Sequence, residues 1–340
     1  MAQETETTAM ERIKVPATPL VSSRIALGTW AMGGWMWGGT DEAESIRTIH
    51  EALDRGVTLI DTAPVYGFGR SEEIVGQALA KGGRRDRVLI ATKVGLDWKD
   101  GHPFRNGSKA RIVKEVEDSL RRLKTDAIDL YQAHWPDPKV PIEETAEAMA
   151  KLYHSGKIRA IGVSNFSPAQ MDAFRAVAPL HTAQPPYNLF ERDIERDVLP
   201  YCVARNIATL AYGSLCRGLL TGRMTAATQF GGDDLRRQDP KFRMPRYQNY
   251  LDAVAALDEF ARANYGKRAI HLALRWVLDR ADTNIALWGA RHPGQLTPID
   301  EVMGWRLDAS AMTAIDAILA RAIPNPVGPE FMAPPDQLAA

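Results

Sequence analysis

Residues 56–67, with the sequence GVTLIDTAPVYG, indicate the fold most directly. The run VTLI at 57–60 is apolar and largely β-branched, which is typical of a buried parallel strand. The run ends at Asp61, and a loop with proline and glycine then carries Tyr66. An ionisable residue that closes a buried strand, followed by a phenol, is typical of a barrel strand with catalytic groups at its carboxyl end. The alternative interpretation is that Asp61 caps the next helix and that Tyr66 packs on the surface.

The composition is that of a globular chain without a strongly charged partner. The 340 residues include 42 basic and 42 acidic side chains, so the formal net charge is zero, which argues against nucleic acid or an anionic membrane as the main partner. No apolar run approaches the roughly 20 residues that span a bilayer, and the N-terminus lacks the apolar segment of a signal peptide. Cys202 and Cys216 are too few for a disulfide framework or a cysteine zinc site. We therefore expect a cytoplasmic protein without a metal site.

Eight short apolar runs alternate with amphipathic helical patterns. The expected strands cover 24–28, 57–61, 87–92, 128–133, 159–163, a run that ends at Gln184, 207–211 and 283–287. Strands that alternate with helices predict a parallel sheet, and the simplest closed arrangement of eight such units is a single-domain (β/α)₈ TIM barrel. A doubly wound open sheet is the alternative.

The remaining segments follow from the same patterns. We expect residues 1–12 to be disordered and residues 13–340 to form one barrel domain, which opens with a short hairpin over 13–25. Helices are expected over 41–55, 71–81, a segment capped by Ser108, 141–156, 168–177, 192–205, 249–264, 269–279 and 309–322. Residues 218–247 have no clean period and carry several arginines, which is typical of a functional or mobile segment.

Four ionisable residues fall at or just beyond the carboxyl ends of neighbouring strands: Asp61, Tyr66, Lys93 and His134. In a barrel these ends share one rim, so residues distant in sequence converge. A single lysine at a strand end is more often part of a surface salt bridge, and it also suits a Schiff-base aldolase. The four residues together favour one catalytic site.

The chemistry of this set is coherent. A phenol with a pKa near 10 is a poor proton donor at neutral pH, and a neighbouring ammonium is expected to lower that pKa. The carboxylate of Asp61 would keep Lys93 charged and oriented, and His134 would orient a carbonyl oxygen or relay a proton. The set predicts a device that protonates a carbonyl oxygen while another group attacks the carbon.

The motifs around these residues are similar to those of the aldo-keto reductase superfamily, and the similarity covers nearly the whole chain. The matching stretches are LGTW at 27–30, LIDTAPVYG at 59–67, ATK at 91–93, IDLYQAHWPD at 128–137, GKIRAIGVSNF at 156–166, Gln184, AYGSLCRGLLTG at 211–222 and WGARHPGQL at 288–296. The tryptophan after His134 and the GARxPxQL segment resemble the bacterial branch related to potassium-channel β subunits.

The resemblance implies a role for each matching position. Tyr66 would be the general acid, Lys93 and Asp61 would tune it, and His134 would orient the substrate. Ser164, Asn165 and Gln184 would hold the nicotinamide carboxamide, and Tyr212 would stack on the ring. Residues 213–218, together with Arg223, would line the pyrophosphate, and Arg291 would bind the 2′-phosphate of NADPH. The complete cofactor set is Thr29, Trp30, Asp61, Ser164, Asn165, Gln184, Tyr212, Gly213, Ser214, Leu215, Arg217, Gly218, Arg223, Gly289, Arg291 and Gln295.

Aromatic residues near the strand ends predict an apolar substrate pocket. Its expected members are Trp30, Trp35, Trp37, Tyr66, Trp98, His134 and Trp135, with Phe331 or Met332 of the C-terminal tail as further contributors. The chain departs from the family pattern where Gly213-Ser214 replaces Ser-Pro and where Trp288 replaces a common proline. Pro298 and Ile299 replace a polar pair that contacts adenine, and Asp300 or Glu301 would have to compensate.

We therefore expect an NADPH-dependent reductase that acts reversibly on small-molecule carbonyl and alcohol substrates. One alternative is a cofactor-binding regulatory module of the channel-β type, and another is a Schiff-base aldolase that uses Lys93. The irregular segment 218–247 is expected to lie over the pyrophosphate and to order when the cofactor binds.

Overall fold

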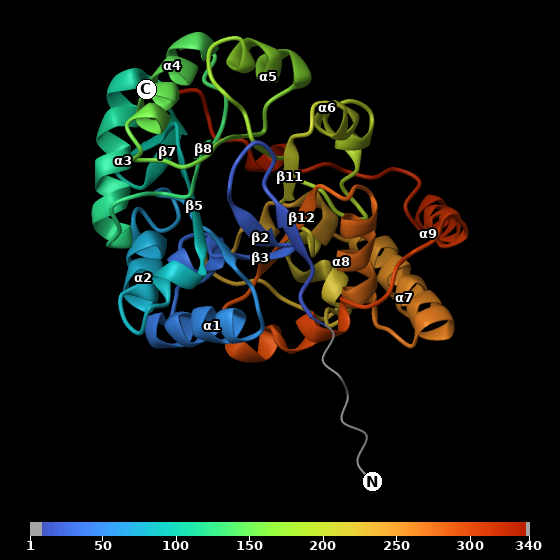
Figure 1. The fold of residues 1–340 in the computed structure, drawn as a ribbon. Helices are drawn as coiled ribbons and strands as arrows, with labels where there is room; N and C mark the ends of the chain where they lie inside the picture. The colour runs from blue at the N-terminus through green and yellow to red at the C-terminus, as the bar shows by residue number, and fades with distance from the viewer. Residues whose placement is uncertain (1–8, 338–340) are drawn as a thin grey trace.

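The computed structural model describes residues 9–337, and its centre is a closed barrel of eight parallel strands (Figure 1). In spatial order the strands are β3 (Ile25–Gly28), β4 (Leu59–Asp61), β5 (Leu89–Val94), β8 (Leu130–Ala133), β9 (Ile161–Ser164), β10 (Thr182–Gln184), β11 (Ala208–Ala211) and β12 (Asn284–Gly289). The barrel closes where β12 pairs with β3, with Leu287 opposite Ala26. The predicted TIM barrel is confirmed, and the open doubly wound sheet is excluded.

Helices surround the barrel. They are α1 (Glu42–Asp54), α2 (Arg70–Leu79), α3 (Lys109–Leu123), α4 (Ile142–His154), α5 (Pro168–Arg175), α6 (Val198–Ala204), α7 (Arg246–Tyr265), α8 (Ala269–Asp279) and α9 (Ala309–Ala322). The predicted N-cap of α3 is present, because Ser108 accepts a hydrogen bond from the Arg111 amide, and Asp41 caps α1 by accepting one from the Glu44 amide. The apolar face of α3 is buried at Ile112 and Val116.

The amino-terminal end of the barrel is closed by a hairpin. Its strands are β1 (Arg12–Lys14) and β2 (Val21–Ser23), as the sequence predicts for this region. Val15 and Leu20 of the hairpin belong to the same buried cluster as Leu59 and Leu210 of the barrel strands. In Figure 1 the blue hairpin lies across the barrel. The carboxyl ends of the strands therefore remain as the place for a site.

The structure differs from the sequence-based expectation in three places. Residues 1–8 lie outside the described part of the chain, but Met10 packs against the core and β1 begins at Arg12, so order begins before residue 13. The helix expected over 192–205 is reduced to α6, after a short 3₁₀ turn at Asp193–Glu195. A hairpin of β6 (Leu96–Lys99) and β7 (His102–Arg105) follows β5, and the sequence analysis missed it.

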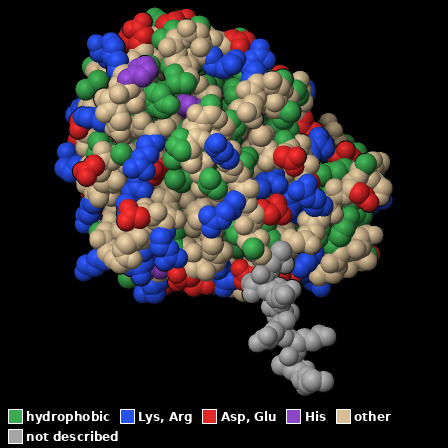
Figure 2. Space-filling model, viewed as in Figure 1, with side chains coloured by type: hydrophobic (Ala, Val, Ile, Leu, Met, Phe, Trp, Pro, Cys, Tyr) green, Lys and Arg blue, Asp and Glu red, His purple; other side chains and the backbone are tan. Residues whose placement is uncertain are grey.

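Residues 218–247 contain little regular structure, as expected. The segment passes through 3₁₀ turns at Cys216–Thr221, Leu235–Arg237 and Pro240–Phe242 before α7 begins. Acidic and basic side chains are intermixed on the face shown in Figure 2, in line with the zero net charge. Between residues 9 and 337, no helix has the length and apolar character that a bilayer span requires.

A carboxylate from the N-terminal segment neutralises two buried arginines at the closed end of the barrel. Arg24 Nη1 and Arg275 Nη1 donate to Glu11 at 3.1 and 2.6 Å. The two arginine side chains are 5% and 0% exposed. Burial would raise the pKa of Glu11, but the hydrogen bonds and charges of Arg275 and Arg24 outweigh burial and lower it. Glu11 is therefore charged at neutral pH.

Glu11→Ala should lower the free energy of unfolding at neutral pH by roughly 2–3 kcal/mol, because two buried cations lose a carboxylate partner. Arg275 keeps its ion pair with Asp279 at 2.8 Å, which limits the loss. Urea denaturation followed by tryptophan fluorescence measures the difference, with Glu259→Ala on the exposed side of α7 as the control. The difference should shrink as the pH falls through the lowered pKa of Glu11. Equal stability of the Glu11 variant and the parent at neutral pH would contradict this role.

Candidate active site

Neighbouring strands deliver polar side chains to the carboxyl end of the barrel. Asp61 ends β4, Lys93 lies near the end of β5, and Gln132 pairs with Lys93 across β5 and β8. Ser164 and Gln184 end β9 and β10 and pair with each other. The four catalytic candidates named from the sequence do converge here.

Lys93 is at the centre of the site. Its Nζ donates to Asp61 Oδ2 at 2.7 Å, to the Thr62 carbonyl oxygen at 2.9 Å and to Tyr66 Oη at 3.2 Å. Three donated hydrogen bonds use all three hydrogens of an ammonium. Burial lowers the pKa of Lys93, and the charge and hydrogen bond of Asp61 oppose that effect. The three acceptors identify the group as a protonated, fixed cation.

Asp61 is held by more than the lysine. Its Oδ1 accepts from Gln184 Nε2 at 2.8 Å and from Gln132 Nε2 at 3.3 Å. Gln132 is not among the site residues predicted from the sequence. Alternation along the strand could have found it, because Gln132 precedes His134 by two positions and such positions point to the same side of a strand.

Tyr66 and His134 lie together above this pair. Their ring centroids are 5.9 Å apart in an edge-to-face arrangement, and the Tyr66 ring also stacks on Trp30 at 5.8 Å. Since Tyr66 Oη accepts a hydrogen bond from Lys93, its own hydrogen remains free to be donated elsewhere.

The ionisation of Tyr66 differs from the expectation. Burial, helped by the negative charge of Asp61, raises the pKa of Tyr66 well above its ordinary value. The lowering expected from Lys93 is therefore outweighed, because a buried phenolate loses its hydration. Burial, together with the charge of Lys93, lowers the pKa of His134 well below its ordinary value. At neutral pH the site contains a phenol, a neutral imidazole and one buried ion pair.

A second hydrogen-bonded group adjoins the first. Tyr212 Oη donates to Asn165 Oδ1 at 3.0 Å, and Asn165 Nδ2 donates to Ser164 Oγ at 3.0 Å. Ser164 Oγ in turn donates to the Gln184 carbonyl oxygen at 2.7 Å. The structure thus brings together the four residues that the resemblance assigns to the nicotinamide end of a cofactor.

Two adjoining cavities open beside these groups. The small cavity, of about 100 Å³, is lined by Tyr66 and His134 together with Trp35, Trp135, Met332 and Pro334. The large cavity, of about 380 Å³, lies along the ends of β11 and β12. Trp30, Tyr66, Tyr212 and Met332 line both cavities. The shared residues make the two cavities one continuous site.

Most of the predicted cofactor residues line the large cavity. They are Trp30, Asp61, Tyr212, Gly213, Ser214, Leu215, Arg217, Gly218, Arg223, Gly289, Arg291 and Gln295. A Cβ built at Gly289 would meet nothing within 4 Å, so the backbone there faces open space. An elongated cavity with glycine backbone and arginines on its wall suits a dinucleotide.

Several predicted residues have other positions. Thr29 lines neither cavity; its hydroxyl bonds to the Asp61 carbonyl oxygen and to Ser71. Trp98 lies outside the small cavity, beside Phe68 and Arg111, and Trp37 lines the large cavity instead of the small one. Both tryptophans pack against other aromatic rings, Trp37 against Trp30 and Trp98 against Phe68, and the sequence does not show these contacts.

The charged residues near the large cavity are partly engaged. Arg291 donates to the carbonyl oxygens of Trp37 and Gly39, each at 2.8 Å, and forms no salt bridge among residues 9–337. The guanidinium of Arg217 instead pairs with the carboxylates of Glu191 and Asp239.

The two residues suggested as replacements for the adenine contact are also engaged. Asp300 pairs with Arg55, and Glu301 pairs with Lys267. Neither lines the large cavity, whereas Pro298 does.

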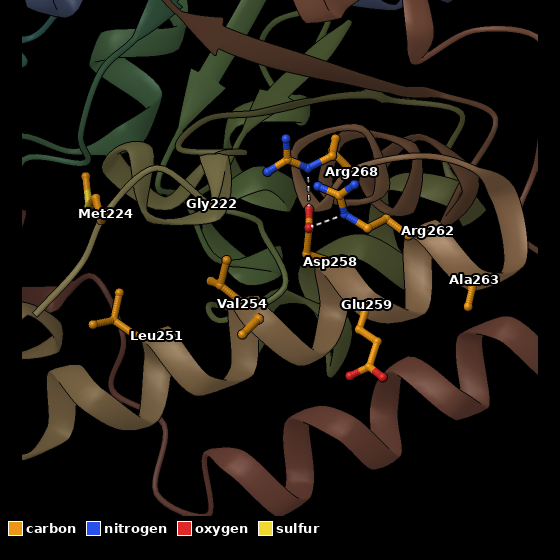
Figure 3. A pocket seen from close by; sticks show the side chains of 10 residues that line it. Gly222, Met224, Leu251, Val254, Asp258, Glu259, Arg262, Ala263 and Arg268 are labelled. Atoms are coloured by element: carbon orange, nitrogen blue, oxygen red, sulfur yellow. Dashed lines mark hydrogen bonds and ion pairs between the residues drawn. The ribbon is translucent and has the colours of Figure 1, made fainter.

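A third hollow, of about 700 Å³, lies on the outer surface over α7 (Figure 3). Three of its charged groups pair with each other, because Asp258 accepts from Arg262 at 2.7 Å and from Arg268 at 2.8 Å. It contains none of the convergent catalytic groups. We therefore assign the site to the two cavities at the barrel end, although this outer hollow is larger.

Known proteins resemble the chain over nearly its whole length. The model of the aldo/keto reductase family matches residues 24–320. Aldo-keto reductase YhdN of Bacillus subtilis (strain 168) is 63% identical over 326 residues, which is 96% of this chain and 98% of that protein. The NADH-specific methylglyoxal reductase of Escherichia coli (strain K12) is 37% identical over 304 residues, 84% of this chain and 91% of that protein. The structure of the glycerol dehydrogenase AKR11B4 from Gluconobacter oxydans matches with a TM-score of 0.86 at 56% identity, over 95% of this chain and 99% of that chain.

Proposed function

Because the chain belongs to the aldo/keto reductase family, we propose that it is a reversible, NADPH-dependent reductase of small aldehydes and ketones, with Tyr66 as the general acid. The observation that carries the proposal is the position of Lys93 Nζ, which contacts both Asp61 Oδ2 and Tyr66 Oη. This contact ties a buried ion pair to a phenol whose hydrogen is free.

Tyr66 performs the proton transfer in this proposal. Its hydroxyl donates a proton to the carbonyl oxygen while the carbonyl carbon receives a hydride, so a carbonyl becomes an alcohol and a phenolate remains. The Lys93 ammonium, 3.2 Å from the phenolic oxygen, stabilises the phenolate until it regains a proton from water. In the reverse direction the phenolate takes the proton from the alcohol.

His134 orients the substrate. Its lowered pKa keeps the imidazole neutral, so that it can donate a hydrogen bond to the carbonyl oxygen without bringing a second cation next to Lys93. The small cavity contains both His134 and Tyr66, and a carbonyl oxygen there would lie between the two donors.

The large cavity is the proposed site of the cofactor, whose nicotinamide end would reach into the small cavity, which Ser164, Asn165 and Gln184 line. A nicotinamide dinucleotide bound there supplies the hydride. Asn165, Ser164 and Gln184 would hold the carboxamide, and only the carbonyl oxygen of the Gln184 side chain remains for that purpose because its Nε2 donates to Asp61. Tyr212 would cover one face of the nicotinamide ring. Backbone groups of residues 213–218 would lie along the pyrophosphate.

The small cavity is the proposed site of the reacting carbonyl group, since Tyr66 and His134 line it. Two relatives carry the names of three-carbon compounds, methylglyoxal and glycerol. We therefore propose short α-oxo aldehydes and hydroxy ketones as the first substrates to test.

The two alternative functions have less support. An aldolase would need Lys93 as a free amine nucleophile, but its Nζ donates three hydrogen bonds and its side chain is fully buried. A purely cofactor-binding module would not need a phenol, an imidazole and an ion pair around one small cavity. Turnover distinguishes a reductase from such a module.

Tyr66→Phe should reduce turnover of methylglyoxal by about 10²–10⁴-fold, because only the acidic hydroxyl is removed. The dissociation constant of NADPH should change little. The measurement is the loss of NADPH absorbance in the steady state, with Tyr265→Phe at the end of α7 as the matched control. Near-parental turnover of the Tyr66 variant, with a deuterium isotope effect from labelled NADPH showing that chemistry limits the rate, would refute the assignment.

Arg291→Ala should erode the preference for NADPH over NADH. A hydrogen-bonded ion pair with the 2′-phosphate contributes about 1.5–3 kcal/mol, which corresponds to a preference of roughly ten- to a hundredfold. Family membership does not fix this preference, since one relative is named as NADH-specific. Fluorescence titration of both nucleotides against parent and variant measures the ratio of the two dissociation constants.

The Arg291 variant also loses its hydrogen bonds to Trp37 and Gly39. That loss alone should weaken the binding of NADPH and NADH equally and leave the ratio of their dissociation constants unchanged. Arg223→Ala is the comparison variant, because Arg223 lines the large cavity and is exposed. An unchanged ratio in the Arg291 variant would move the phosphate contact to Arg223.

A further inference from the structure

A buried cluster of four charged side chains lies behind the wall of the large cavity. Its members are Glu191, Arg217, Asp239 and Lys241, and we call it the Arg217 cluster. Glu191 lies between β10 and α6, Arg217 follows β11, and the other two belong to the turn before α7. All four side chains are at most 4% exposed. Two cations and two carboxylates make the cluster electrically neutral.

Inside the cluster each cation pairs with both carboxylates. Arg217 Nε donates to Asp239 Oδ2 at 2.7 Å, and Arg217 Nη2 donates to Glu191 Oε1. Lys241 Nζ is 2.7 Å from Glu191 Oε1 and 3.5 Å from Asp239 Oδ1. Buried charges without partners are unfavourable, so these contacts fix the position of each side chain.

The backbone at Arg217 explains why its side chain turns away from the cavity. Cys216 and Arg217 have φ angles of 46° and 54°, both in the left-handed region that non-glycine residues rarely adopt. In this turn Arg217 lies on the wall of the large cavity. Its guanidinium points away from the cavity and reaches the carboxylates of Glu191 and Asp239 behind that wall.

The same two cations hold the C-terminal tail, which we define as residues 327–336. Lys241 Nζ donates to the Gly328 carbonyl oxygen at 3.0 Å. The Arg217 guanidinium lies 5.5 Å from the centre of the Phe331 ring, and its Nη1 is 3.9 Å from Met332 Sδ. In Figure 1 the red tail runs from α9 across the barrel towards α3 and α4.

The tail reaches the small cavity beyond these contacts. Met332 lines both cavities, and Pro334 lines the small one. Arg105 of the β6–β7 hairpin holds the far end, since its Nε donates to the Pro334 carbonyl oxygen at 3.2 Å. The tail is thus held at both ends, by Lys241 at Gly328 and by Arg105 at Pro334. Arg217 contacts the tail between these two points.

We propose that Arg217 is a positioning residue for the substrate: through Phe331 and Met332, the buried Arg217 cluster holds the tail as the wall of the small cavity, and the Arg217 guanidinium contacts no cofactor phosphate. This inference rests on the proposed function in that the small cavity receives the carbonyl substrate. It assigns to Arg217 a different role from the pyrophosphate contact expected from the sequence.

The first test is Arg217→Lys, which keeps the charge but loses the planar fork and its contact with Phe331. A small displacement of a positioning group can cost up to about 10²-fold, and we expect roughly a tenfold higher KM for methylglyoxal with a smaller change in kcat. The NADPH dissociation constant, from fluorescence titration, should stay within about twofold of the parent. Arg262→Lys on the surface of α7 is the matched control and should change neither quantity.

The second test does not depend on catalysis. Chymotrypsin cleavage after Phe331, followed by intact mass, should be faster in Arg217→Lys than in the parent and in Arg262→Lys, because the tail is released more often. This readout stays valid if the chain has no reductase activity, so it separates failure of this inference from failure of the proposed function.

A third variant keeps the ion pairs intact. Phe331→Leu should also raise the KM for methylglyoxal. Combining it with Arg217→Lys should add little, because both substitutions remove the same contact between Arg217 and Phe331. This variant also serves if Arg217→Lys fails to fold. Unchanged tail cleavage in Arg217→Lys, additive effects of the two substitutions, or a tenfold weaker binding of both NADPH and NADH with an unchanged KM would overturn the inference.

Discussion

The buried ion pair between Lys93 and Asp61 is the interaction on which the rest of the site depends. Two charges removed from water are stable only where other groups replace their hydration. The barrel supplies those groups: the Thr62 carbonyl oxygen accepts from Lys93, and the amides of Gln132 and Gln184 donate to Asp61. The carboxyl ends of β4, β5, β8 and β10 thus supply the hydrogen bonds that replace water around one ion pair.

The two ends of the barrel differ in how far they are closed. At the amino-terminal end the hairpin and the Glu11–Arg275 pair close the interior. At the carboxyl end the interior stays polar and opens into two cavities, which the tail and residues 218–247 border. One end of the barrel is therefore closed, and the other holds the candidate catalytic groups.

The sequence predicts the barrel and the four candidate catalytic residues that meet at its carboxyl end, because both depend on local patterns. Each strand is a short apolar run, and residues such as Asp61 and Lys93 interrupt the apolar pattern at a strand end. The sequence does not predict where a long side chain finds its partner. Arg217 lies in a cavity-lining segment, yet its guanidinium pairs with Glu191 and Asp239, which are 26 and 22 residues away.

Two further differences between the structure and the expectations from the sequence also arise from tertiary packing. The raised pKa of Tyr66 reflects its burial, which sequence proximity to charged residues cannot reveal. Trp98 belongs to an unpredicted hairpin and packs beside Phe68, outside the small cavity. The predicted cofactor contacts and the ordering of residues 218–247 on cofactor binding remain predictions.

The pH dependence of kcat/KM in both directions tests the central claim most directly, because the claim is that burial and the charge of Asp61 keep Tyr66 protonated. Carbonyl reduction uses the phenol, so its kcat/KM should be flat between about pH 6 and 9, below the raised pKa of Tyr66. Alcohol oxidation uses the scarce phenolate, so its kcat/KM should rise by roughly tenfold per pH unit over the same range. A fall in reduction through neutral pH, or oxidation that is independent of pH, would contradict the account.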